Sequence, residues 1–151
     1  MEKIKRAIFV SVYFTIILGI TSCAYTFMSQ VIYLENGEAI KVTLETTSGY
    51  EFVLYDDGRL AIKKGNQEVA QGGFLTDLDY SAFLEGVEIL EATPEDSPNF
   101  YFFQFNGENG LVYGFLQKIE DSVTSFNMFM DSLSLADAQE LTQRLHFEKA
   151  D

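Results

Sequence analysis

Short apolar segments separated by tight-turn sequences recur along most of this chain. Ile40, Val42 and Leu44 alternate with polar side chains, which is the period of a half-buried β-strand. Asn36-Gly37 precedes that segment, and Asn-Gly between apolar runs is a strong hairpin signal. The repetition of this pattern predicts a meander of antiparallel strands. The candidate strand segments are 31–34, 38–47, 50–55, 59–63, 67–74, 87–90, 100–105, 111–119 and 123–130.

The segment 100–105 is aromatic at every position except Gln104. A strand that is apolar on both faces is usually central in its sheet or covered by other elements. The alternative is an exposed aromatic strip for a partner or a glycan. Large exposed apolar patches are uncommon on soluble domains, so the segment is expected to belong to the core.

Two helices are expected. Asp79 is a favourable N-cap for a short helix over 80–84. The sequence from Ser134 to Asp137 is similar to a capping box, with Asp in place of the usual Glu, and precedes a helix over 135–145. This second helix is expected to be amphipathic, with its apolar positions at helical spacing. Those positions are Leu135, Ala138, Leu141 and Leu145.

These elements predict an α+β fold: a mainly antiparallel sheet of about seven or eight strands, with the C-terminal helix packed on one face. Residues 31–151 are expected to form a single globular domain. The chain has one cysteine, so an internal disulfide is impossible and stability must come from packing. The 14 Phe and 8 Tyr supply the apolar area for a core.

The N-terminal segment has the pattern of an export signal. Lys3, Lys5 and Arg6 form a basic start, the run 7–20 is apolar, and the only cysteine, Cys23, follows small polar residues. The arrangement resembles the lipobox of bacterial lipoproteins. The resemblance implies cleavage immediately before the cysteine and attachment of lipid to its sulfur.

Within this resemblance, Ile20, Thr21 and Ser22 are the expected recognition residues for the signal peptidase. Cys23 is the expected lipidation site, carrying a diacylglyceryl group with acyl chains such as palmitate. Two acyl chains hold a protein stably on a membrane, whereas one does so only marginally. The basic start places the rest of the chain across the membrane. The expectation is a signal peptide over 1–22, a lipid-anchored tether over 23–30 and a domain on the extracytoplasmic side of the cell envelope.

Two other interpretations of the N-terminal segment remain open. Residues 7–28 are long enough to form an uncleaved membrane helix, which needs about 20 mainly apolar residues. An ordinary secretory signal with a chance cysteine is the other.

The charge of the mature chain excludes some functions. Removal of residues 1–22 leaves 129 residues with 7 Lys and Arg and 22 Asp and Glu, a formal charge of −15. Such a surface repels nucleic acid phosphates, so no nucleic acid partner is expected. His146 is the only histidine, expected at the end of the C-terminal helix where the helix dipole favours a cation. No Gly-x-Ser-x-Gly elbow accompanies it, and a lipidated cysteine is not a nucleophile. No catalytic residue and no enzymatic activity are therefore expected.

Metal sites are also not expected. The chain has too few Cys and His for structural zinc. Calcium needs only oxygen ligands, and three short acidic pairs offer them, but none follows the EF-hand pattern. Turn formation and helix capping explain these pairs better, so no metal and no cofactor are predicted. The pairs are Asp77 with Asp79, Asp56 with Asp57, and Glu95 with Asp96.

The sequence favours a non-enzymatic, lipid-anchored binding or assembly module for another envelope protein. An alternative is a binder of a cation, glycan or peptide through an acidic or aromatic pocket between the sheet and the helix. An enzyme is the third and least supported class, because nucleophile and metal sets are missing.

Overall fold

A computed structural model describes residues 27–151, which contain ten strands and two helices. The strands form two fully antiparallel sheets, with orders β3-β4-β5-β9-β8-β7-β6 and β1-β2-β10. The strands are β1 (Phe27–Tyr33), β2 (Ala39–Glu45), β3 (Tyr50–Leu54), β4 (Leu60–Lys64), β5 (Gln67–Thr76), β6 (Glu88–Thr93), β7 (Phe100–Gly107), β8 (Gly110–Lys118), β9 (Thr124–Met130) and β10 (Leu145–Lys149). The helices are α2 (Tyr80–Phe83) and α3 (Leu135–Arg144).

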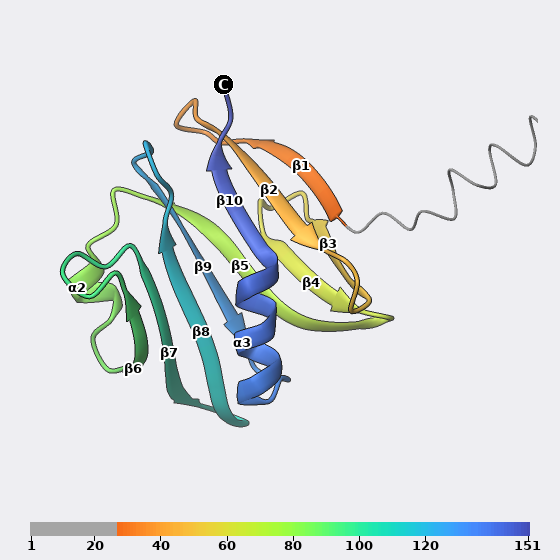
Figure 1. The fold of residues 1–151 in the computed structure, drawn as a ribbon, viewed down its shortest axis with the longest axis vertical. Coiled ribbons are helices and arrows are strands. Elements are labelled where there is room, and N and C mark those ends of the chain that lie inside the picture. The colour runs from red at the N-terminus through yellow and green to blue at the C-terminus, as the bar shows by residue number, and fades with distance from the viewer. Residues whose placement is uncertain (1–26) are drawn as a thin grey trace, which may run out of the picture.

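The three-stranded sheet and α3 lie over one face of the seven-stranded sheet (Figure 1). The core between these layers is centred on aromatic rings from both sheets. Phe126 of β9 stacks on Phe147 of β10 with ring centroids 4.3 Å apart, and Phe115 of β8 lies 5.9 Å from Phe126. Ala138 and Leu141 of α3 are fully buried in the same cluster. The expected antiparallel sheet and C-terminal helix are therefore present.

The expected single sheet of seven or eight strands was wrong, because the chain forms ten strands in two sheets. The first strand also begins earlier than expected. Phe27 to Gln30 belong to β1 and pair with Glu45 to Val42 of β2, so these four residues are part of the sheet and not of a tether. Alternation is weak in this segment because most of its side chains are exposed, which explains why the sequence pattern did not reveal it.

His146 was expected at a helix end, and the structure corrects this. α3 ends at Arg144, and His146 lies in β10, exposed and opposite Thr43 of β2. The flanking Leu145 and Phe147 are both buried, which requires the period of two that only a strand provides.

Both predicted helix starts are confirmed. The Asp79 carboxylate accepts hydrogen bonds from the backbone N–H groups of Ser81 at 3.0 Å and Ala82 at 3.2 Å. Ser134 Oγ accepts the N–H of Asp137 at 3.2 Å. The Asp137 carboxylate accepts the Ser134 hydroxyl at 2.6 Å, so the two side chains bond to each other.

The aromatic strand β7 is buried on both faces, which confirms its assignment to the core. Phe102 points into the layer between the sheets and is 1% exposed. Phe103 points to the opposite face and is fully buried, with the Phe83 ring of α2 6.2 Å away. A Cβ at Gly114 would lie 2.6 Å from the Phe103 ring, so the absence of a side chain there makes room for Phe103.

Glu38, the residue immediately before β2, connects the two sheets. Its carboxylate accepts hydrogen bonds from Ser122 Oγ and Thr124 Oγ1, both at 2.6 Å, and lies 3.1 Å from Lys149 Nζ. The two hydroxyl donors and the nearby ammonium lower the pKa of Glu38 from 4.5 to about 2. The partners come from the β8–β9 connection, β9 and β10, so one side chain holds three segments together.

This network predicts a pH-dependent loss of stability. Ionised Glu38 stabilises the fold above about pH 4.5, and this contribution disappears as the pH falls from about 4.5 to about 2. In a Glu38→Gln variant, the free energy of unfolding by urea should fall less steeply over this pH range than in the natural protein. Glu120→Gln is the matched control, because Glu120 is exposed in the β8–β9 connection that also contains Ser122. This variant should keep the slope of the natural protein. Identical slopes for Glu38→Gln and the natural protein would contradict this role.

Candidate functional site

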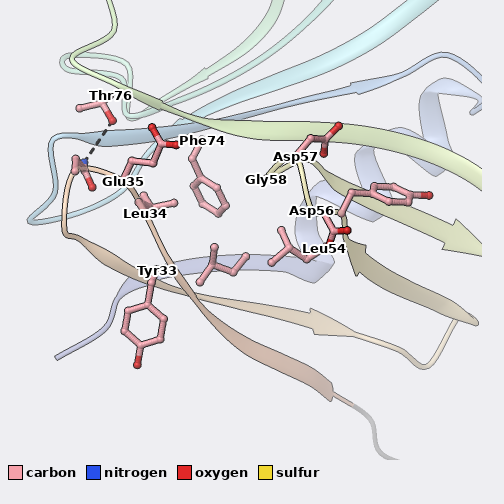
Figure 2. A pocket seen from close by; sticks show the side chains of 12 residues that line it. Tyr33, Leu34, Glu35, Leu54, Asp56, Asp57, Gly58, Phe74 and Thr76 are labelled. Atoms are coloured by element: carbon pink, nitrogen blue, oxygen red, sulfur yellow. Dashed lines mark hydrogen bonds between the residues drawn. The ribbon is translucent and has the colours of Figure 1, made fainter.

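A pocket of about 620 Å³ opens between the β1–β2 hairpin and the β3–β4 hairpin (Figure 2). Phe74 projects into it from β5 (Figure 2). Leu34, Leu54 and Ile32 complete an apolar floor. Tyr33 belongs to the same rim, but its ring points away from the pocket (Figure 2).

Two tight turns position this pocket. The N–H of Leu34 donates to the carbonyl of Glu38 at 2.9 Å and closes the β1–β2 hairpin. The N–H of Tyr55 donates to the carbonyl of Arg59 at 2.9 Å and closes the β3–β4 hairpin, in which Gly58 has φ of +81°. A left-handed φ is the reason that glycine suits this position. Successive strands reverse direction, so both turns lie at the same end of the molecule and face each other across the pocket.

Three carboxylates stand on the rim: Glu35, Asp56 and Asp57. Asp57 accepts the backbone N–H of Arg59 at 3.0 Å and lies 3.7 Å from its Nε. Among residues 27–151, no Lys or Arg forms an ion pair with Glu35 or Asp56. The rim therefore offers two exposed carboxylates without a cationic partner in the described part of the chain.

The wall beside Glu35 is fixed by Asn36. Its amide donates to Thr76 Oγ1 at 3.4 Å, which is the dashed line in Figure 2, and to Thr124 Oγ1 at 3.1 Å. Its Oδ1 accepts the N–H of Glu38 at 3.0 Å, which shapes the turn. These bonds tie the hairpin of the small sheet to β5 and β9 of the large sheet, so the pocket is supported from both layers.

An apolar floor with carboxylates at its mouth suits a group that has a cationic head and an apolar body. A lysine or arginine side chain with an apolar neighbour has this chemistry. In the described part of the chain, no three His, Cys, Asp or Glu side chains come together in a way that could hold a metal ion.

The acidic pairs noted in the sequence are distributed over the surface. Asp56 and Asp57 reach the pocket rim. Asp79 caps α2, and Asp77 adopts a left-handed φ of +50° in the preceding turn. Glu95 and Asp96 are exposed between β6 and β7.

The predicted lipidation site and its recognition residues lie outside the described residues. They are Ile20, Thr21, Ser22 and Cys23. Neither helix within residues 27–151 is long and apolar enough to cross a membrane.

A ligand pocket was expected between the sheet and the helix, whereas the pocket described here lies between two hairpins. Phe74 and Leu54 were recognised as strand residues but not as lining residues. A usable signal was present in the turns. Asn36-Gly37 and Asp56-Asp57-Gly58 are separated by one further reversal of the chain, so both must lie at one end of a meander.

Comparisons with protein-family models, with curated proteins and with solved structures found no match.

Proposed function

We propose that this protein is a non-enzymatic, lipid-anchored binding module on the extracytoplasmic side of the cell envelope. Its partner is a segment of another envelope protein that presents a basic side chain beside an apolar one. The observation that carries the binding role is the pocket in which Glu35 and Asp56, free of ion pairs in the described residues, stand above the apolar side chains of Leu54 and Phe74.

The anchoring part of the proposal rests on the lipobox resemblance at Ile20-Thr21-Ser22-Cys23. β1 begins at Phe27, four residues after the cysteine. Four residues span at most about 14 Å when fully extended. A domain so tethered stays beside the bilayer, where a membrane-bound partner is within reach.

A small cationic ligand is a second candidate. It is favoured by the pocket volume of about 620 Å³, which falls within the range of roughly 300–1,000 Å³ typical of small-molecule sites. A ligand that binds only the folded state must raise the melting temperature. A thermal-shift series with free amines, against the same series with basic peptides, separates the two candidates.

The proposal predicts that charge reversal at the rim abolishes partner capture. In a Glu35→Lys/Asp56→Lys variant, the yield of the dominant crosslinked partner from intact membranes should fall about tenfold or more, because like charges then face each other. The yield is measured by quantitative mass spectrometry after affinity purification.

Glu95→Lys/Asp96→Lys makes the same charge change on the β6–β7 connection and serves as the control. Its capture yield should stay near that of the natural protein. Equal loss in both variants would show that overall charge, and not the pocket, governs binding.

A further inference from the structure

We infer that the outer face of β1 contacts the headgroup region of the membrane, so that this strand runs along the bilayer surface. This orientation depends on the lipid anchor proposed at Cys23. The contact is made by Phe27, Val31 and Tyr33, which we call the β1 strip.

The β1 strip is unusually exposed for apolar side chains. Phe27 is 55% exposed, Val31 38% and Tyr33 83%. They occupy odd positions of the strand and so lie on the face opposite the buried Ile32. Three of the nine exposed large apolar side chains of the described residues belong to this strip, and Met28, also exposed, lies on the other face of the strand. Such clustering on a surface strand marks a contact surface.

The distance from the anchor limits what can cover this strip. Only Ala24, Tyr25 and Thr26 separate the lipidated cysteine from Phe27. The link reaches at most about 14 Å. The headgroup layer on each side of the hydrocarbon is roughly 5–7 Å thick. The bilayer surface is thus the apolar–polar boundary nearest to β1, and Phe and Tyr rings favour such a boundary.

The distribution of charge agrees with this orientation. The strands β1, β2 and β10 together carry two Lys and two Glu, a net charge of zero. The stretch 65–117 carries nine Asp and Glu and no Lys or Arg. Within that stretch, β6 and β7 lie on the side of the molecule away from β1 (Figure 1). When the domain contacts the membrane through the neutral sheet, its acidic side stays away from anionic headgroups, which would repel the acidic side chains.

β1 is also an edge strand of its sheet, and an exposed edge with apolar side chains tends to pair with another chain. A second copy of the protein is therefore the rival occupant. At the headgroup level the edge N–H and C=O groups keep their water, so the membrane contact satisfies them without a second chain.

The chain contains no tryptophan, which allows a single fluorescent reporter. The lipidated protein, residues 23–151 with Tyr33→Trp, is placed in vesicles of phosphatidylethanolamine and phosphatidylglycerol, with and without brominated acyl chains. Tyr33 is the strip residue farthest along the chain from the anchor, so it reports whether the strand contacts the bilayer along its whole length. The emission should be quenched roughly twofold or more, because interfacial aromatic rings sit beside the acyl boundary.

Ile89→Trp is the matched control, because Ile89 is 47% exposed and lies on β6. Its emission should be unaffected by bromination. If Tyr33→Trp is not quenched while the same material carries the mass increase of the lipid, the membrane contact is overturned and the anchor stands. If the mass increase is absent, the contact and the anchor are both overturned. A blue shift that grows with protein concentration, without bromine quenching, assigns the β1 strip to a second copy and also overturns the inference.

Discussion

Replacing Cys23 by Ser is expected to abolish lipid labelling and to stop processing of the signal peptide or release the protein from the membrane. The sequence from Ile20 to Cys23 resembles a lipobox. In bacterial lipoproteins, the sulfur of the lipobox cysteine is the atom that accepts the diacylglyceryl group. Two acyl chains give stable attachment, and their loss leaves no comparable anchor. Metabolic labelling with palmitate and membrane fractionation measure the two effects.

Ser22→Ala is the control, since it keeps a small residue before the cysteine. That variant should be labelled, cleaved and retained like the natural protein. If Cys23→Ser keeps the natural size and stays in the membrane, the segment 7–28 is an uncleaved membrane helix. If the natural protein is cleaved but carries no label, the segment is an ordinary secretory signal.

Replacing Phe126 by Ala is expected to lower the free energy of unfolding by about 3–5 kcal/mol, the usual cost of a large cavity in a packed core. Phe126 is fully buried. Its ring lies 5.0 Å from that of Phe74, 5.9 Å from Phe115 and 4.3 Å from Phe147. These neighbours belong to β5, β8 and β10, so the cavity would open where the two sheets meet.

Urea unfolding followed by circular dichroism measures this loss. Phe27→Ala removes the same side chain from an exposed position on β1 and should change the free energy of unfolding by no more than about 0.5 kcal/mol. A loss below about 1 kcal/mol for Phe126→Ala would mean that the two sheets do not pack through this ring.

Local features of this fold were predictable from the sequence. The strand expected over 50–55 is Tyr50–Leu54, and that expected over 111–119 is Gly110–Lys118. Both strands are bounded by tight turns, and turn residues fix the backbone through conformations and hydrogen bonds within a few positions along the chain. The helix caps at Asp79 and Ser134 were predictable for the same reason.

The division into two sheets was not predictable, because it depends on contacts between distant segments. The turn at Ser48-Gly49 has the appearance of another hairpin, yet β2 pairs with β1 and β10 and not with β3. The pairing of Lys41 with Glu148 closes a loop of more than a hundred residues. Alternation shows that a strand has one buried face, but it does not identify the neighbouring strand.

The pocket follows the same division. Its acidic rim at Asp56 and Asp57 was recognisable as a turn, while its floor joins β1, β3 and β5 from both sheets. Phe74 lines the floor because β5 continues under the small sheet. There the centroid of the Phe74 ring lies 6.4 Å from that of Phe147. Only the packing of one sheet on the other creates this space.

The most direct test of the proposed anchored state is the intact mass of the protein purified from its native membrane. We expect a chain that begins at Cys23, with the mass of residues 23–151 increased by a diacylglyceryl group. An intact Met1 together with a free thiol at Cys23 would contradict it.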